Sequence, residues 1–175
     1  MDSTQIGLTG EFYTLAQLMQ HGLVATLTLG NTKGVDILVS NPELNRLYKV
    51  EVKTGNRPPA CESLFGEELH HAWPMSAKHE HIDDDSLFYC FVVLRGADEL
   101  PRFFIVPSAY VAAYVREQHA YWVRTKHPSG ADTTMRRFRI PVSDPLGFEG
   151  NWGLLEGDPI PERQRVLDEP WVSSP

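Results

Sequence analysis

Two apolar segments of the chain contain charged residues of types that could carry out chemistry. Asp36 stands within the run GVDILV, and Glu51 and Lys53 flank Val52 in the run YKVEVKTG. Carboxylate oxygens are preferred ligands of Mg²⁺, and a lysine beside a metal-bound water can stabilise developing negative charge. These residue types therefore suit metal-assisted hydrolysis of a phosphodiester bond.

Both segments are predicted to be β-strands, covering Val35–Val39 and Tyr48–Lys53, and the turn-rich sequence SNPELN joins them. Side chains alternate between the two faces along a strand. Glu51 and Lys53 are therefore expected to point to one face of their strand, while the valines between and before them point to the other.

The two strands are predicted to form a hairpin that turns between residues 43 and 44. This register places Asp36 across from Glu51 and Gly34 across from Lys53, which leaves space for the lysine side chain. Cross-strand neighbours have Cβ atoms about 4.5–5.5 Å apart. Two carboxylates at that separation repel each other unless a positive charge lies between them.

A divalent cation between the two carboxylates would remove that repulsion. Mg²⁺ takes one or two carboxylates, waters and a substrate phosphate as ligands. We expect Asp36, Glu51 and the carbonyl of Val52 to bind Mg²⁺, with Mn²⁺ as a substitute, and Lys53 to assist the water. The alternative is the solvated face of an edge hairpin, of which an ExK sequence alone is more typical. The residues themselves leave both interpretations open.

Together with Glu11, these segments resemble the PD-(D/E)xK nuclease superfamily, which includes restriction endonucleases and archaeal-type Holliday junction resolvases. The resemblance spans roughly residues 8 to 106, and the short spacings are most similar to the resolvase-like branch. It implies an α/β (α+β) fold with a restriction-endonuclease-like core, a central mixed β-sheet flanked by helices, in the order α-β-β-β-α-β. It also implies metal binding by Asp36 and Glu51, assistance from Lys53, and a Glu11 that binds the metal or orders its waters.

The rest of the chain is predicted from periodicity and turn residues. Thr9 is expected to cap a first helix that begins at Gly10 or Glu11 and ends near Gly22. The other predicted elements are a strand over Leu23–Leu29, a short helix over Trp73–His81, a buried strand over Leu87–Leu94, a strand over Phe103–Val106, a helix from Ser108 to about His119, an edge strand over Arg137–Val142 and a turn or short helix over residues 150–155.

Composition bounds the class of protein. With 175 residues and a hydrophobic fraction of 42%, the chain is expected to form one nuclease-like domain over 1–156 and a Pro-rich C-terminal arm over 157–175. No apolar run approaches the roughly 20 residues that span a bilayer, so no membrane partner is expected. Cys61 and Cys90 lack a metal-type neighbour such as CxxC, which favours a reducing compartment and a cytoplasmic location.

Net charge bears on the expected partners. A formal charge of -7 disfavours non-specific binding to nucleic acid, although a basic stretch lies between residues 124 and 139. We expect DNA rather than RNA as the substrate, contacted by Asn56, Arg57 and Lys78, a homodimer, and a protein partner for the arm. The alternative is a non-catalytic nucleic-acid-binding or interaction module that retains the nuclease fold. A third interpretation is an inhibitor or immunity protein with a basic partner.

Four histidines lie close together in the sequence and raise the question of a zinc site. They are His70, His71, His79 and His81. Structural zinc sites use paired ligands with defined spacing, usually with cysteine, and that pattern is absent here. Surface histidines beside a loop are the preferred interpretation.

Overall fold

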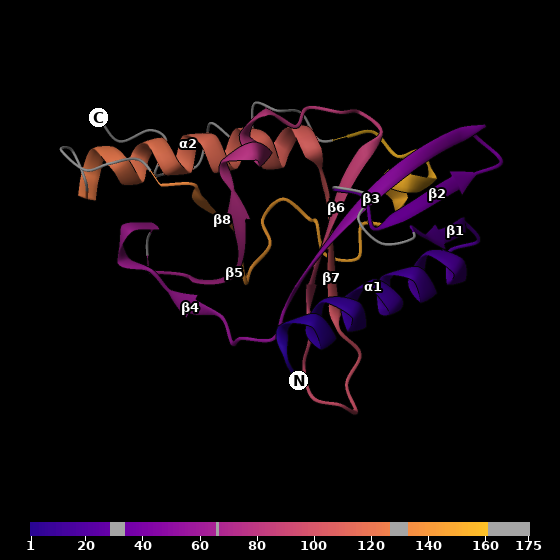
Figure 1. Cartoon of the computed structure of the whole chain (residues 1–175), viewed down its shortest axis with the longest axis horizontal. Helices are drawn as coiled ribbons and strands as arrows, with labels where there is room; N and C mark the ends of the chain where they lie inside the picture. The colour runs from indigo at the N-terminus through magenta and orange to yellow at the C-terminus, as the bar shows by residue number, and fades with distance from the viewer. Residues whose placement is uncertain (29–33, 66, 127–132, 161–175) are drawn as a thin grey trace. The chain divides into compact units, whose positions relative to one another are not determined.

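The structure is a computed structural model, and it describes residues 1–28, 34–65, 67–126 and 133–160 (Figure 1). The described residues form two compact units. The first contains residues 1–57, 84–107 and 146–160, and the second contains residues 58–83 and 108–145. The expected division into a domain over 1–156 and an arm over 157–175 stays a prediction, since most of the arm lies outside the described ranges. Within those ranges, no helix combines the length and apolar character that crossing a membrane requires.

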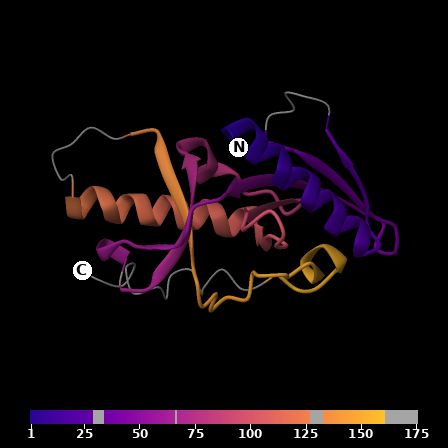
Figure 2. The ribbon, with the colours of Figure 1, turned by 90° about the horizontal axis from the view of Figure 1, so that it is seen from below.

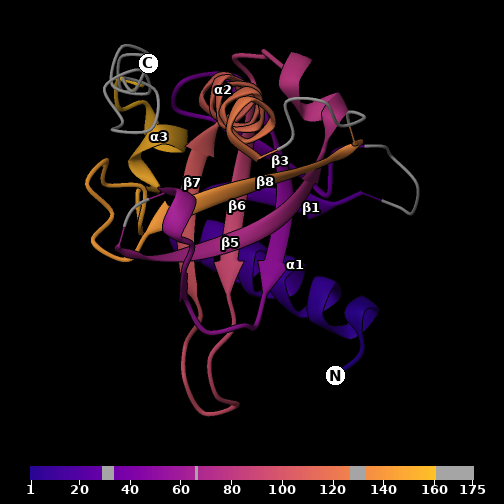
Figure 3. The same ribbon diagram turned by 90° about the vertical axis from the view of Figure 1, so that its left-hand side faces the viewer.

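The first unit is built on a five-stranded mixed sheet in the order β1-β2-β3-β6-β7. Strands β3 and β6 are parallel, and every other neighbouring pair is antiparallel. This arrangement confirms the predicted fold class. Figure 3 shows β3, β6 and β7 side by side. The strands are β1 (Val24–Leu27), β2 (Ile37–Asn41), β3 (Arg46–Gly55), β6 (Leu87–Val93) and β7 (Arg102–Pro107).

Helix α1 (Ser3–Gln20) packs across β1, β2 and β3 on one face of this sheet (Figures 1 and 2). The core of the unit combines residues of α1, of that sheet face and of the short helix α3 (Gly153–Glu156), among them Leu18, Val39, Val50 and Leu155. All 7 residues of β6 are buried, as its continuous apolar sequence predicts.

The predicted hairpin register is confirmed. Ile37 pairs with Val50 and Asn41 pairs with Arg46, so the turn centres on residues 43 and 44. Continuing this register by one residue places Asp36 across from Glu51. Alternation along the two strands and the turn sequence between them were sufficient to set this pairing, because both are local properties.

The predicted start of the first helix is wrong. Helix α1 begins at Ser3, and Asp2 caps it in a reciprocal capping box with Gln5. Gly10, which was predicted to start the helix, lies inside it. A glycine is present there because α1 approaches β3 closely at this point. A Cβ atom at this position would stand 1.9 Å from the Thr54 hydroxyl oxygen. The end at Gly22 is confirmed, and this glycine has a left-handed φ of 76°.

The second unit contains a three-stranded antiparallel sheet in the order β4-β5-β8 and the helix α2 (Ser108–Lys126). Tyr110 and Tyr114 of α2 both meet the ring of Phe138 edge-on, which packs the helix on β8. The strands are β4 (Ala60–Cys61), β5 (Leu69–Ser76) and β8 (Met135–Pro141), with short 3₁₀ helices η1 (Ser63–Phe65) and η2 (Ala77–His81).

The short helix predicted over Trp73–His81 is correct only for its second half. Its first residues continue β5, in which His71, Trp73 and Met75 are buried while the residues between them are exposed. This period of two is the signature of a strand, and the helical turn starts only at Ala77. Strand β8 lies at a sheet edge as predicted, and α2 continues to Lys126, beyond its predicted end.

Candidate active site

Asp36 lies immediately before β2, at the end of the hairpin ladder. Its backbone N–H donates to the carbonyl of Val50 at 2.9 Å, and its own carbonyl accepts from the N–H of Thr28 at 2.9 Å. The side-chain Oδ2 accepts a hydrogen bond from the N–H of Val52 at 2.7 Å. The carboxylate is thereby fixed against the edge of β3, just beyond the last residue of β2 that pairs there.

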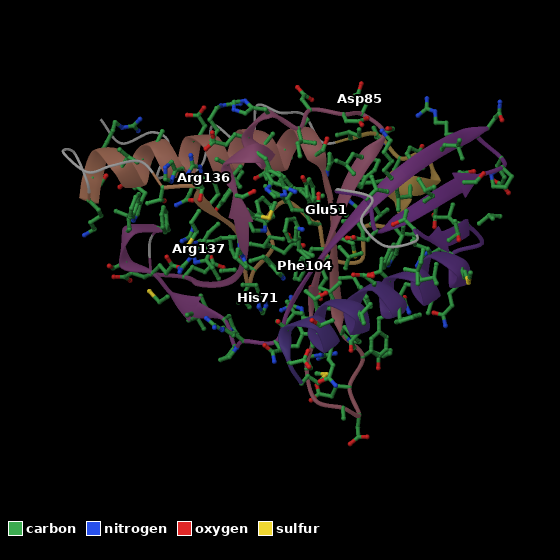
Figure 4. The ribbon with its side chains drawn as sticks, viewed as in Figure 1. Glu51, His71, Asp85, Phe104, Arg136 and Arg137 are labelled. Carbon is green, nitrogen blue, oxygen red and sulfur yellow. The ribbon has the colours of Figure 1, made fainter. Side chains whose placement is uncertain are left out.

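Glu51 and Lys53 form a pair on one face of β3, as alternation predicts. The ammonium nitrogen of Lys53 lies 2.5 Å from Oε1 of Glu51, and only 3% of the Glu51 side chain is exposed (Figure 4). Gly34 lies beside them with a left-handed φ of 78°. A Cβ atom at Gly34 would stand 3.5 Å from the other Glu51 oxygen, so this glycine borders the carboxylate rather than the lysine.

Glu11 joins this group from helix α1. Partial burial raises its pKa, the negative charge of Asp36 raises it further, and the positive charge of Lys53 lowers it. Glu11 therefore feels the charges of Asp36 and Lys53, although α1 packs on the sheet face opposite Glu51. A carboxyl whose charge is opposed by burial and by a second carboxylate gains from a nearby cation.

Tyr89 belongs to the site and was missed by the sequence analysis. It lies on β6, directly beside Glu51 in the parallel register, and it is fully buried. Burial raises the pKa of its hydroxyl, and the nearby charge of Glu51 raises it further. The Tyr89 hydroxyl therefore stays neutral beside the Glu51 carboxylate. The available signal was a polar atom inside the apolar run LFYCFVVL.

The donor atoms fit Mg²⁺ with an incomplete protein ligand set. Asp36, Glu51 and Glu11 offer hard carboxylate oxygens. The Val52 carbonyl points to the same edge of β3 as its N–H, which bonds Asp36. In the described ranges, no group of three or more His, Cys, Asp or Glu side chains could by itself hold a metal ion, so waters and a substrate phosphate would have to complete the coordination. One or two carboxylates with waters completing the octahedron is the usual arrangement for Mg²⁺.

The residues expected to contact nucleic acid belong to different units. Asn56 and Arg57 are exposed and follow the carboxyl end of β3 in the first unit. Lys78 is exposed on η2 in the second unit. Glu11, Asp36, Glu51, Val52 and Lys53 all lie in the first unit, so a single unit carries every expected catalytic and metal-binding residue.

Two of the four clustered histidines do not have the surface position that the sequence suggested. His71 is 6% exposed and His79 is 3% exposed, whereas His70 is half-buried and His81 is exposed. Nδ1 of His79 lies 3.1 Å from the backbone nitrogen of Ser76, so this imidazole closes the turn of η2. The burial of His71 follows from the strand alternation of β5. The described histidines do not gather into a metal site.

Comparisons with known proteins identify a solved structure with a similar fold. A scan against protein-family models found no match, and a search of curated proteins found none either. Among solved structures, the chain is similar to a bacterial homing endonuclease, I-Ssp6803I, with a TM-score of 0.54 over 88% of this chain and 91% of that chain. This chain has a nuclease-like fold. The sequence identity of 15% limits the comparison to the arrangement of helices and strands.

Proposed function

We propose that the chain is a Mg²⁺-dependent endonuclease of the PD-(D/E)xK superfamily that hydrolyses phosphodiester bonds of DNA. The observation that carries the proposal is the pairing of Glu51 with Lys53 on β3, with the Asp36 carboxylate bonded to the N–H of Val52 between them. Strands with no common task would not be expected to place two acids and a lysine so close together at the end of a hairpin. Repair, recombination and defence against foreign DNA are the roles that such an activity would serve.

Asp36 and Glu51 would hold the metal ion, with the Val52 carbonyl as a third protein ligand. When bound, Mg²⁺ supplies Lewis-acid stabilisation of the phosphate charge and lowers the pKa of a coordinated water. The Val52 N–H already orients the Asp36 carboxylate, and the Lys53 ammonium holds that of Glu51. Glu11 would order waters around the ion or bind it directly.

Lys53 would act on the reacting groups rather than on the metal. Its ammonium is held beside Glu51, and 27% of its side chain remains exposed, so a substrate can reach it. A positive charge held in this position stabilises negative charge that develops on the attacking water or the phosphate oxygens. Pairing with Glu51 also places this charge in advance, so no side chain has to be ordered during the reaction.

The broader setting of the proposal is a dimeric enzyme that acts on DNA in a reducing compartment. The fold neighbour is a homing endonuclease, which supports DNA over RNA. Cys61 and Cys90 are free thiols, which supports the expected cytoplasmic location. A two-fold homodimer would supply one active site for each DNA strand.

The second candidate is a non-catalytic module that retains the nuclease fold and binds nucleic acid or a protein. The observation in its favour is the formal net charge of -7, which opposes tight binding to phosphates. The complete set of Glu11, Asp36, Glu51 and Lys53 favours catalysis. A binding module needs no Mg²⁺ at Asp36 and Glu51, so metal binding separates the two candidates.

The deciding experiment incubates the purified full chain with Mg²⁺ or Mn²⁺ and with linear, supercoiled, flap and four-way-junction DNA. We expect cleavage of at least one substrate, abolished by EDTA and by Asp36→Asn. Mg²⁺ binding is measured in parallel by calorimetry. A folded chain that neither binds Mg²⁺ nor cuts any of these substrates would contradict the proposal and leave the binding module as the better account.

A further inference from the structure

The second unit contains a cavity whose lining includes none of the residues proposed for catalysis. Its volume is about 620 Å³, which falls within the range of small-molecule binding sites. Described residues of three segments line it. They come from residues 61–65 around η1, from the last turns of α2, and from β8 with the residues just before it. Arg136 and Arg137 of β8 are labelled in Figure 4.

Positive charge dominates the polar part of the cavity wall. The cations are Lys126, Arg136, Arg137 and Arg139, and the lining carboxylate is Glu62. Arg139 is buried and binds Glu62 through two hydrogen bonds, Nε at 3.1 Å and Nη2 at 2.7 Å. Its guanidinium also lies 4.3 Å from the centre of the Phe65 ring. Its remaining Nη1 is buried and makes no hydrogen bond to a described residue, so a ligand oxygen reaching this nitrogen would provide an acceptor.

The cations differ in how firmly other groups hold them. Arg136 is buried and bonded to the Glu80 carboxylate and to the carbonyl of Thr133. Arg137 has a side chain that is 51% exposed, and its contact with Glu62 is longer, at 3.3 Å. Lys126 is exposed at the last residue of α2. Arg137 and Lys126 are therefore the cations available to a ligand phosphate, while Arg136 and Arg139 maintain the wall.

The remaining wall is aromatic and apolar. The rings of His119 and Trp122 are stacked, with centroids 5.6 Å apart and planes 24° from parallel. Leu64, Phe65 and Met135 extend this surface. Flat aromatic side chains provide stacking platforms for nucleobases, and stacking tolerates any base because every base has a π-face. A simple anion such as phosphate or a carboxylic acid would leave this part of the cavity unused.

We propose that this cavity binds a nucleotide unit, with the base against Trp122 and the phosphate against Arg137 and Lys126. The ligand chemistry is an aromatic ring joined to a phosphate group. A free nucleotide and a single nucleotide of a DNA strand both provide it. The inference rests on residues of the second unit alone, so it does not depend on the nuclease activity proposed for the first.

The test measures binding by calorimetry with the full-length chain in EDTA, so that no metal-dependent cleavage contributes. The probes are deoxyadenosine 5′-monophosphate, deoxyadenosine and inorganic phosphate. We expect the monophosphate to bind at least about tenfold more tightly than either fragment, because only the monophosphate engages both parts of the wall. Absence of monophosphate binding, or phosphate binding of equal strength, would overturn the proposal.

Variants localise the binding. Arg137→Ala and Trp122→Ala are each expected to weaken monophosphate binding by about tenfold or more, because each removes one of the two recognition elements. The matched control is Arg116→Ala, since this arginine of α2 has the same 51% side-chain exposure and does not line the cavity. Equal weakening by Arg116→Ala and Arg137→Ala would show general charge attraction and would overturn the site. If Trp122→Ala does not fold, Trp122→Phe and Lys126→Ala provide the test.

A further probe separates the two sources of the nucleotide. A 5′-phosphorylated single strand of a few nucleotides that binds more tightly than the monophosphate identifies a DNA strand as the natural ligand. Equal affinity identifies a free nucleotide. The same measurements on Asp36→Asn are expected to give unchanged nucleotide binding. If the unsubstituted chain binds the nucleotide but cleaves no DNA, only the proposed nuclease is contradicted. If it cleaves DNA but does not bind the nucleotide, only this cavity is contradicted.

Discussion

The ammonium of Lys53 lies 2.5 Å from the carboxylate of Glu51, and both side chains leave the same face of β3. Burial makes this pairing important for stability, because the Glu51 carboxylate is almost completely removed from water. A buried carboxylate needs a positive partner, and here the partner can be the lysine, a metal ion or both in turn. The following expectations rest on this arrangement.

Lys53→Ala is expected to abolish DNA cleavage while Mg²⁺ binding persists, because the variant keeps both metal-binding carboxylates. Removing the partner of buried Glu51 should also lower the free energy of unfolding by about 1–3 kcal/mol in the absence of metal. Cleavage assays and urea unfolding measure the two effects. The matched control is Lys49→Ala, which removes a lysine of the same strand that pairs with Asp84 at 2.7 Å. Wild-type cleavage by folded Lys53→Ala would contradict the role assigned to this lysine.

Asp36→Asn and Glu51→Gln are expected to weaken Mg²⁺ binding by at least about tenfold and to remove cleavage, because a neutral amide is a poor ligand for this ion. Calorimetric titration with MgCl₂ measures the affinity. An exposed acid on the hairpin turn provides the control, since Glu43→Gln changes the net charge equally. If Glu43→Gln reduced the affinity as much as Asp36→Asn, the ion would be held by general charge rather than by the site.

The raised pKa of Glu11 predicts that metal binding depends on pH. Its pKa is raised above 4.5 by burial and by Asp36, so the folded protein retains this proton at a higher pH than the unfolded chain does. Ionisation of Glu11 therefore reduces stability as pH rises through that raised pKa, and a bound cation reverses the effect. Mg²⁺ affinity should fall as pH drops toward the raised pKa. In Glu11→Gln this part of the decline should disappear; an unchanged profile would place Glu11 outside the metal site.

Tyr89→Phe is expected to remove the polar hydroxyl beside the buried Glu51 carboxylate and to destabilise the protein by about 1–3 kcal/mol. An apolar neighbour in its place disfavours the ionised carboxylate, so the pH at which Mg²⁺ affinity declines should move upward. Tyr48→Phe is the control because Tyr48 lies buried in the core beneath α1, on the opposite face of the sheet. A positioning role requires the pH shift, and a merely structural role predicts destabilisation without it.

Two glycines of α1 provide a matched pair for the contact between helix and sheet. Gly10→Ala is expected to destabilise the protein by about 1–3 kcal/mol, because the added methyl group overlaps the Thr54 side chain. A Cβ atom at Gly7 meets nothing within 4 Å. Gly7→Ala should stabilise the helix by about 0.5–1 kcal/mol. Thermal unfolding compares them, and Thr54→Ala should restore most of the loss in Gly10→Ala. Equal effects of both substitutions would contradict the close approach.

Local properties of the sequence were enough for the hairpin that carries Asp36, Glu51 and Lys53. Alternation sets which side chains share a face, and the turn over residues 43 and 44 sets which residues face each other. The buried strand over Leu87–Leu94 was also predictable, since an unbroken apolar run of strand length leaves few alternatives. The nuclease-like fold followed from the order of these elements.

Local patterns misled where two signals competed. Glycines at positions 7 and 10 weakened the helical pattern in the first half of α1, so the helix start was predicted too late. Asp2 and Gln5 form the capping box of the true start. The presence of Gly10 is explained by its close contact with Thr54, a residue far from it in the chain. In β5, strand alternation extends through Pro74, a residue whose missing N–H argues against a strand.

Long-range contacts decided the rest. Tyr89 reaches Glu51 because β6 pairs in parallel with β3, and that register depends on a crossover that no local pattern specifies. The nucleotide cavity assembles residues near 62, 119 and 137, which become neighbours only after α2 packs on β8. Sequence alone determined which residues of the hairpin can do chemistry, because strand geometry has a fixed period. Tertiary structure determined which distant side chains support them, because packing brings together residues that the chain keeps apart.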